Sequence, residues 1–514
     1  MNNPDYIFET SWEVCNRVGG IYAVLSTRAA SMQKEHPDKV FFFGPDFGPH
    51  SDVYFKEDKS LLKGWKRTGV RVGRWAVPGE PIAILLKADK LWAEKDAIYS
   101  WAWENFGVRS HAAYGDYDES CLFGYAAGQV MESLYNYLMT KTPDAKTVMH
   151  ANEWQTAFAI FYIRAHCPKI GTLFTTHATG IGRSIAGNGK PLYDYFEGYH
   201  GDQMAEELNM VSKHSVEKMA AHWADCFTTV SEITARECAQ LLDKPVDIVT
   251  PNGFEPDFVP KGKAFDSARA SARAALIRAA ESLLGSRLPD NSLLVGISGR
   301  LEWKNKGIDV FMSAMERLGE KLYHSQALLS ATSLYPLGEV VAFVMVPYLD
   351  KPVTRFGKVT VVFVPYYLNG NPVTDYPAPF APLAGYTYYN LLAGLDLTVF
   401  PSYYEPWGYT PLESIAFHVP TITTDVAGFG AWALQEGVTG LKDGVEVIHR
   451  NDSNYDEVVD NVALNIQRFM QQPAENIERA RKAASSLSKK AEWKYFYKYY
   501  HKAYDIALTK SLSR

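Results

Sequence analysis

The feature that most constrains this fold is a regular alternation of short apolar segments with longer amphipathic ones. In the first half, segments rich in β-branched and aromatic residues occur at 6–10, 40–43, 81–86, 147–150, 172–176, 226–230 and 247–250. From about residue 293 the alternation resumes with "LLVGISG", "VVAFVMV", "VTVVFV", "LTVFPS" and "PTITT". Strands that are apolar at nearly every position, with helices between them, indicate a parallel sheet covered on both faces. Two such sets predict two doubly wound, Rossmann-like α/β domains.

A chain of 514 residues is longer than one hydrophobic core usually serves, which agrees with two domains. Proline and glycine cluster in "TPNGFEPDFVPKGK", residues 250–263, and mark the expected joint. We therefore expect one domain over 1–255 and a second over 256–490. The remaining stretch, 491–514, begins with an aromatic helix whose side chains we expect in a core.

Composition argues against several classes of protein. A net charge of −6 disfavours nucleic acid or an anionic membrane as a main partner. The five cysteines are scattered and form no CxxC, so neither a disulfide framework nor a zinc site is expected. No signal peptide is evident, and the longest apolar run, 340–348, is far shorter than the ~20 residues of a membrane span. A reduced cytoplasm is the expected location.

The notable polar residues follow predicted strands in both halves, where open α/β sheets bind ligands. We therefore expect a ligand in a cleft between the two domains. The first such loop is "NRVGGIY", in which Gly19 and Gly20 allow close backbone approach. The helix that follows would offer free N–H groups to an anion, and Arg17 would add charge. A plain turn between strand and helix is an equally open interpretation.

The loop "GRLEWKNKG" places Arg300 directly after a strand and Lys306 six residues later. Two cations at a strand end suit a leaving diphosphate, whose negative charge grows as its bond breaks. Lys304 is the neighbouring cation that we expect to face solvent. The pattern is weak by itself, because basic residues near strand ends are common.

Four further residues are candidates from their positions alone. "TTHATGIGR" puts His177 at a strand end and Arg183 six residues on, while Glu153 follows another strand. Asn252 lies at the expected joint. A lone histidine is more often structural than catalytic, so both roles stay open for His177.

The stretch "EPWGYTPLE" holds two glutamates eight positions apart. Thr410 and Glu413 are spaced as a capping box with Pro411 at the first helical position, which predicts that Glu413 closes back on the Thr410 amide. Glu405 has no such structural role and lies beside a glycine-containing turn. We therefore expect Glu405 to contact ligand, and Glu413 to be a cap first and a ligand contact second.

Several strings together resemble one family. "NRVGGIY", "TTHATGIGR", "FTTVSEIT", "TPNGF", "NKGIDVF", "FPSYYEPWGYTPLE" and "VPTITTDVAGFG" are similar to glycogen synthases of the eukaryotic type, in order from residue 6 to about 505. The resemblance implies a GT-B fold, with two Rossmann-like domains and a C-terminal helix, 491–514, that crosses back to the first. It also implies a retaining transfer of glucose from UDP-glucose to the non-reducing 4-hydroxyl of an α-1,4-glucan, without metal or further cofactor. ADP-glucose as donor, and a silent glycogen-binding scaffold, remain the alternatives.

The resemblance also implies roles for single residues. Arg300 and Lys306 match the pair that neutralises the donor diphosphate. His177 and Glu405 match residues against the transferred glucose, and Glu413 matches one nearer the ribose. The other donor-site positions that match are Arg17, Gly19, Gly20, Glu153, Arg183, Asn252, Trp407, Gly408 and Tyr409.

Three departures from the family pattern stand out. Asn152 occupies a position where the family commonly has histidine. The C-terminal stretch that senses glucose 6-phosphate in eukaryotic members holds only Arg479 and Arg481 here, so this activation is not expected. The segment 322–389 lacks the longer insertion used in tetramer assembly, which leaves the oligomeric state open. Together these departures suggest a bacterial, less regulated member.

Overall fold

The computed structural model describes residues 2–324, 339–347 and 351–514. The chain forms two compact units, one of Met1–Glu255 with Glu492–Arg514 and one of Pro256–Ala491. The change of unit after Glu255 falls within the proline- and glycine-rich segment 250–263. The segment 322–389, for which we expect no tetramer-forming insertion, lies partly outside the described residues.

Within the described residues, unit 1 holds a sheet in the order β3-β4-β5-β2-β1-β6-β7-β8-β9. Its pairs are parallel except β3–β4 and β4–β5. The strands are β1 Tyr6–Thr10, β2 Val40–Pro45, β3 Phe55–Glu57, β4 Val70–Trp75, β5 Ile82–Leu86, β6 Thr147–Asn152, β7 Gly171–Thr176, β8 Cys226–Thr229 and β9 Ile248–Val249. All seven strands that we predicted for the first half are present, with shifts at their ends.

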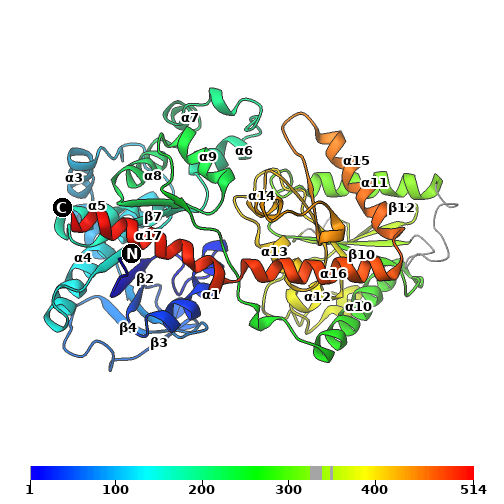
Figure 1. Ribbon diagram of the computed structural model, residues 1–514, viewed down its shortest axis with the longest axis horizontal. Helices are drawn as coiled ribbons and strands as arrows, with labels where there is room; N and C mark the ends of the chain where they lie inside the picture. Colours follow the sequence, from blue (N-terminus) through cyan, green and yellow to red (C-terminus); the bar gives the residue numbers. More distant parts are fainter. Residues whose placement is uncertain (1, 325–338, 348–350) are drawn as a thin grey trace. The chain divides into compact units, whose positions relative to one another are not determined.

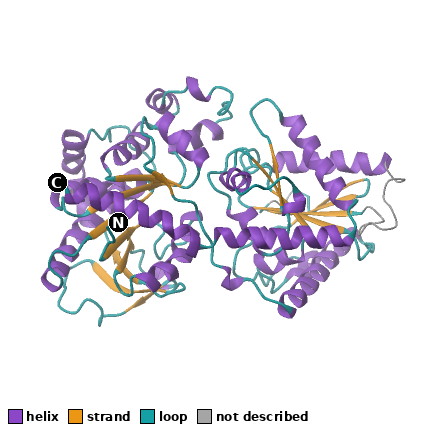
Figure 2. Ribbon diagram, in the orientation of Figure 1, coloured by secondary structure: helices purple, strands orange, loops and turns teal. Residues whose placement is uncertain are grey.

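Helices cover both faces of this sheet, as Figure 2 shows. They are α1 Gly20–Glu35, α2 Pro49–Asp52, α3 Lys95–Phe106, α4 Tyr117–Lys141, α5 Ala157–His166, α6 Gly180–Gly187, α7 Gly201–Glu207, α8 Val211–Trp223, α9 Glu232–Leu241 and α17 Trp493–Leu512. The core beneath them is continuous and holds buried side chains of β1, β2, β5, α4 and α5.

Unit 2 has a second sheet, in the order β12-β13-β11-β10-β14-β15-β16 over the described part of the chain. Only the edge pair β12–β13 is antiparallel there. The strands are β10 Leu293–Ser298, β11 Val340–Met345, β12 Val353–Phe356, β13 Val359–Phe363, β14 Leu397–Val399, β15 Thr421–Thr424 and β16 Val445–Ile448. The helices are α10 Lys263–Leu284, α11 Ile308–His324, α12 Tyr388–Gly394, α13 Tyr409–Ala416, α14 Gly428–Gln435, α15 Tyr455–Met470 and α16 Ala474–Ser488.

Two parallel-rich α/β sheets confirm the predicted fold class. The strands that the alternation fails to predict are β3, β4, β12 and β16, which lie at or next to a sheet edge. Of these, β16 pairs parallel with β15, and the others pair antiparallel. Half-buried edge strands carry fewer apolar residues than strands covered on both faces. Their sequences therefore lack the continuous apolar run.

The aromatic C-terminal helix α17 packs on unit 1, where it contacts α1, β7 and β8 (Figure 1). Trp493, Tyr500 and Tyr504 are fully buried and belong to a core as predicted, whereas Tyr495 on the same helix is 50% exposed. The indole N–H of Trp493 donates to Thr27 Oγ1 at 2.8 Å and joins this helix to α1. No helix among the described residues is long and apolar enough to cross a membrane.

Candidate active site

A fully buried ion pair lies near the carboxyl end of β1 in unit 1. Arg28 Nη2 on α1 donates to Glu9 Oε1 at 2.7 Å, and both side chains are 0% exposed. Burial by itself favours the neutral acid, but the positive charge of Arg28 and hydrogen bonds from His150 and Asn152 lower the pKa of Glu9 to about 2. Glu9 is therefore a carboxylate that holds three donors at the centre of the sheet.

Two residues of β6 contact this carboxylate. His150 Nδ1 lies 2.8 Å from Glu9 Oε1, and its Nε2 lies 2.7 Å from Thr175 Oγ1. Asn152 Nδ2 donates to Glu9 Oε2 at 3.0 Å and to the Thr10 carbonyl at 3.2 Å. These contacts join β1, β6 and β7 through side chains that the sequence analysis, apart from noting the departure at 152, did not connect.

His177 follows β7 and is the outermost member of this network. Its Nε2 lies 3.2 Å from Asn152 Oδ1, and its backbone N–H donates to Glu153 Oε1 at 2.5 Å. The ring is partly exposed. Burial of most of the imidazole, with help from the nearby charges of His150 and Arg28, lowers the pKa of His177 to about 3. The imidazole is therefore neutral at physiological pH.

Glu153 belongs to a second polar cluster, with Glu217 on α8 and Glu237 on α9. Its backbone lies in the left-handed region, at φ 70°, and its carboxylate also accepts the Ala178 N–H at 3.2 Å. Glu217 accepts the Thr176 hydroxyl and the Gly180 N–H, the latter at 2.9 Å. Burial raises the pKa of Glu153 to about 7 and that of Glu217 to about 8.

Glu217 and Glu237 were missed by the sequence analysis. Glu217 lies between core positions of α8, and Glu237 accepts the Thr179 hydroxyl at 2.6 Å. An acidic residue on the apolar face of a predicted helix was the available signal, because such a residue needs a buried partner.

In the loop "NRVGGIY" an acidic side chain of the chain itself occupies part of the helix end. Glu13 Oε2 accepts the N–H of Gly19, the N-cap of α1, at 2.7 Å and the N–H of Tyr22 in its first turn at 2.8 Å. The Glu13 carboxylate thus interacts favourably with the partial positive charge at the N-terminus of this helix. Gly19 and Gly20 are exposed, and Arg17 is exposed with its guanidinium 5.6 Å from the Tyr22 ring centre.

In unit 2, Arg300 and Lys306 both lie in the loop after β10. Arg300 is about half exposed and pairs with Glu302 at 2.9 Å. Lys306 reaches across to Glu405, in the loop after β14, and forms an ion pair with its Oε2. The two side chains are 19% and 16% exposed, so this pair stays accessible at its edge.

The backbone brings these two loops together. Gly307 has φ 71°, and a Cβ there would lie 2.0 Å from the Pro401 carbonyl oxygen, so only glycine allows this approach. The Asn305 carbonyl accepts the N–H groups of Tyr403 and Tyr404 at 3.0 and 3.1 Å. The contact between the basic loop and the glutamate loop, which the sequence did not predict, thus lies within unit 2.

The predicted capping box at Thr410–Glu413 is wrong. Helix α13 begins at Tyr409 with Gly408 as its N-cap, at φ 110°, and no side chain caps it. Because glycine tolerates this conformation, the helix starts early and Thr410 falls inside its first turn. Glu413 instead accepts the Tyr389 hydroxyl at 3.0 Å, and burial raises the pKa of Glu413 to about 7.

Trp407, a donor-site position implied by the resemblance, has a buried side chain. Its indole is 4% exposed and lies 6.2 Å from the Trp432 ring, and its carbonyl accepts the Phe429 N–H at 2.7 Å. The ring packs the turn from within, and the backbone carbonyl ties it to α14. Tyr409 and Gly408 follow it at the start of α13, where Tyr409 is partly exposed.

Two candidates of unit 1 lie apart from the contacts above. Arg183 is exposed on α6, close enough to Glu153 to lower the pKa of that carboxyl, although burial of Glu153 has the larger opposite effect. Asn252 is 4% exposed, and its Oδ1 has no hydrogen-bond partner among the described residues.

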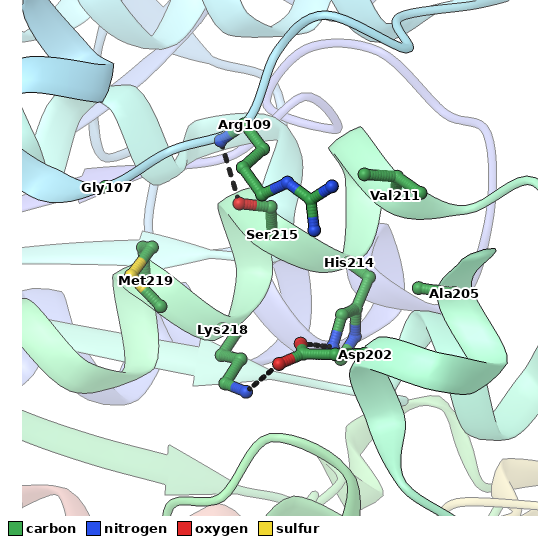
Figure 3. Close-up of a pocket in the computed structure, with 9 residues that line it drawn as sticks. All are labelled: Gly107, Arg109, Asp202, Ala205, Val211, His214, Ser215, Lys218 and Met219. Carbon is green, nitrogen blue, oxygen red and sulfur yellow. Dashed lines mark hydrogen bonds and ion pairs between the residues drawn. The ribbon is translucent and has the colours of Figure 1, made fainter.

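Unit 1 also has a cavity of about 110 Å³ beside α7 and α8, shown in Figure 3. Asp202 lines it and accepts hydrogen bonds from His214 Nε2 at 2.9 Å and Lys218 Nζ at 2.8 Å. These two partners keep the pKa of Asp202 below its usual range. None of the predicted site residues lines this cavity. In the part of the chain that the structure describes, no group of three or more His, Cys, Asp or Glu side chains is placed to hold a metal ion.

Comparison with known proteins agrees with this geometry. The family model described as glycogen synthase matches residues 9–354 and 353–513. The liver glycogen [starch] synthase of Homo sapiens is 24% identical over 98% of this chain and 84% of its own length. Isoform 1 of Saccharomyces cerevisiae is 26% identical over 98% of this chain and 86% of its own length.

Solved structures support the fold. The catalytic domain of starch synthase IV from Arabidopsis thaliana, bound to ADP and acarbose, aligns with TM-score 0.57 and 14% identity over 99% of both chains. An α,α-trehalose 6-phosphate synthase from Burkholderia multivorans aligns with TM-score 0.55 and 10% identity over 99% of this chain and 98% of its own. The chain belongs to the glycogen synthase family and has the GT-B glycosyltransferase fold.

Proposed function

We propose that this glycogen synthase family member transfers glucose from UDP-glucose, with retention, to the non-reducing 4-hydroxyl of an α-1,4-glucan. The observation that carries the proposal is the Lys306–Glu405 pair of unit 2, with Arg300 on the same loop as Lys306. Two cations and a carboxylate on neighbouring loops support the proposal, because cations suit a diphosphate and a carboxylate can accept sugar hydroxyls.

Lys306 and Arg300 would act on the leaving group. The bond between glucose C1 and the diphosphate oxygen breaks with its electron pair going to that oxygen, and positive charges beside it stabilise the transition state more than the substrate. Lys306 is a compact charge on a flexible stem and can turn from Glu405 to the diphosphate. Arg300, half exposed on the same loop, offers a planar fork of N–H donors to phosphate oxygens.

Glu405 and His177 would act on the sugar. Glu405 accepts hydrogen bonds from glucose hydroxyls, and the neutral imidazole of His177 lies against the oxocarbenium-like ring without adding a positive charge to it. The acceptor 4-hydroxyl attacks C1 on the face that the diphosphate leaves, which keeps the α configuration. Its proton passes to the departing phosphate, so the products are UDP and a glucan longer by one glucose. This route needs no metal and no cofactor besides the nucleotide sugar, and a cytoplasmic location remains a prediction.

The remaining donor-site residues keep proposed roles. Glu413, held by Tyr389, is proposed near the ribose, and Gly408 and Tyr409 beside the diphosphate. Glu153 orients the backbone at His177 through two hydrogen bonds. Arg17, Gly19, Gly20, Arg183 and Asn252 are proposed as donor contacts of unit 1, although Glu13 already caps the helix that the two glycines begin.

The first test is a transfer assay with glycogen and radiolabelled UDP-glucose or ADP-glucose, without glucose 6-phosphate, counting label in precipitated polymer. Incorporation from UDP-glucose alone supports the proposal. Incorporation from ADP-glucose alone retains the reaction and corrects the donor. No incorporation from either donor, while glycogen still binds, contradicts the proposal and supports a scaffold role.

A further inference from the structure

We infer that Asn152 is a positioning residue, which holds His177 in the tautomer protonated at Nε2 and leaves Nδ1 as the hydrogen-bond acceptor of the ring. The link from this acceptor to glucose transfer rests on the proposed function. The tautomer itself rests only on the contacts within unit 1.

The orientation of the Asn152 amide is set from its buried side. Two groups lie there within hydrogen-bond distance, Glu9 Oε2 at 3.0 Å and the Thr10 carbonyl oxygen at 3.2 Å. Both can only accept, because Glu9 is ionised and a carbonyl oxygen has no hydrogen. The amide must therefore turn its Nδ2 toward them. The opposite orientation would place an amide oxygen against a carboxylate, with three buried acceptors facing one another.

The orientation of Asn152 then decides the protonation of His177. With Nδ2 committed to Glu9, Oδ1 faces His177 Nε2 at 3.2 Å. Two acceptors cannot form a hydrogen bond, so Nε2 must carry a hydrogen. The imidazole is neutral, since burial and the charges of His150 and Arg28 disfavour a second proton. Nδ1 is then an unprotonated nitrogen with a lone pair.

Glu9 is in turn held rigidly. Arg28 and Asn152 donate to its two oxygens, and the Arg28 guanidinium carbon lies 4.1 Å from the ring centre of Tyr500 on α17. His150 donates to Glu9 through Nδ1 and accepts from Thr175 through Nε2, so its tautomer is the opposite of the one inferred for His177. With Glu9, Arg28, His150 and Asn152 all at most 1% exposed, solvent cannot rearrange the network.

The tautomer matters for a cationic transition state. A lone pair at Nδ1 accepts a sugar hydroxyl and raises the electron density of its oxygen, which favours an oxocarbenium-like ring. An N–H at Nδ1 would place a partial positive charge there instead. Because this difference grows as positive charge develops, loss of the tautomer should lower kcat more than it raises KM.

The test uses the full chain labelled with ¹⁵N-histidine, without ligand, and reads the two-bond correlations between ring nitrogens and ring hydrogens. The signal of His177 among the 13 histidines is assigned by its loss in His177→Gln. We expect the pattern of a single Nε2–H tautomer in the unaltered chain. Leucine in Asn152→Leu is similar in size but cannot accept a hydrogen bond from His177, so we expect a mixture of the two His177 tautomers. We also expect kcat to fall by about tenfold, with the KM for the donor within about threefold of its original value.

Two further variants separate positioning from folding. In Asn152→His an imidazole can donate to Glu9 with one nitrogen and accept from His177 with the other, so tautomer and most of kcat should return. Thr175→Val removes the hydroxyl that serves His150 on the other side of the same buried network. It should leave the His177 pattern unchanged even if stability falls.

An Nδ1–H pattern in the unaltered chain would overturn the inference, and so would an Nε2–H pattern that persists in Asn152→Leu. A shift of the His177 pattern in Thr175→Val as large as in Asn152→Leu would also overturn it. If Asn152→Leu does not fold, the His177 patterns of the unaltered chain and of Asn152→His still test the inference. Absence of transfer in a chain with the Nε2–H pattern would contradict the proposed function and leave the tautomer established.

Discussion

The two units each pair an acidic side chain with a basic one near strand ends, but the pairs differ in exposure. In unit 1, Glu9 and Arg28 are both 0% exposed, whereas in unit 2 Glu405 and Lys306 are 16% and 19% exposed. A pair sealed from water cannot exchange a partner for a ligand. A pair at the edge of the protein can, so we assign orientation of the site to the first and substrate contact to the second.

The choice of cation fits this division. Arginine stays charged when buried, forms several directed hydrogen bonds and stacks on aromatic rings, as Arg28 does on Tyr500. Lysine is a compact point charge that reorients easily, which suits a residue that must meet a diphosphate during the reaction. Four predictions test this division of roles, in order of decreasing expected effect.

Arg28→Met breaks the sealed pair. It leaves the Glu9 carboxylate buried without its cation, which should lower the free energy of unfolding by ~3–5 kcal/mol. Urea unfolding measures the loss. Adding Glu9→Gln should recover part of it, since the buried charge is then removed. A loss below about 1 kcal/mol in Arg28→Met would contradict the structural role assigned to the pair.

Lys306→Ala breaks the open pair. We expect kcat for transfer to glycogen to fall by about 10²–10³-fold, the usual effect of removing one donor to a developing negative charge. Glycogen binding and the free energy of unfolding should change little, because Glu405 can be hydrated at its exposed edge.

The matched control for this change is Lys304→Ala on the same loop. Lys304 is exposed, with its Nζ 4.2 Å from the ring centre of Tyr403, and its removal should leave kcat within about threefold. Equal losses in the two variants would mean that general positive charge, and not the position of Lys306, supports transfer.

Glu217 is a third case, a buried acid that, among the described residues, has no cation beside it as Glu9 has Arg28. Burial raises the pKa of Glu217 to about 8 in the folded chain, above an unfolded value of about 4.3. The folded state then holds the proton more tightly, so this stability is fully present at low pH and is lost as pH rises through about 8. Between pH 7 and 9 the loss should be ~1 kcal/mol.

Comparing the unaltered chain with Glu217→Gln isolates this effect. Burial also raises the pKa values of buried cysteines, so their thiols ionise more readily in the unfolded chain. This lowers the free energy of unfolding with rising pH in both proteins alike. Between pH 7 and 9 the unaltered chain should therefore lose ~1 kcal/mol more unfolding free energy than Glu217→Gln. Parallel curves over this range would show that Glu217 is ionised throughout.

Thr410→Ala gives the smallest expected change. A true N-cap would cost ~1 kcal/mol on its removal. Because α13 begins at Tyr409 and is capped by no side chain, we expect the free energy of unfolding to change by less than ~0.5 kcal/mol. A loss near the cap value in urea unfolding would restore the capping box that the sequence predicted.

The sequence located the polar loops but did not determine their contacts. It placed Arg300, Lys306 and Glu405 at strand ends, but it could not pair Lys306 with Glu405, which lie 99 positions apart. It left the N-terminus of α1 open between an anion site and a plain turn, and it did not predict that Glu13 accepts the Gly19 and Tyr22 N–H groups there. It also gave Glu413 a local partner, where the structure provides the Tyr389 hydroxyl of α12.

By itself the sequence determined the alternation of buried strands and amphipathic helices, and with it the two α/β sheets and the loops that follow their strands. These are local properties, since hydrophobic periodicity depends only on neighbours along the chain. Tertiary structure alone decided which charges are sealed, which acids keep their protons and which tautomer His177 adopts. Asn152 and Glu9 are separated by 143 positions, yet their contact sets the amide that faces the histidine. Burial and partners, which control protonation, exist only once distant segments have packed together.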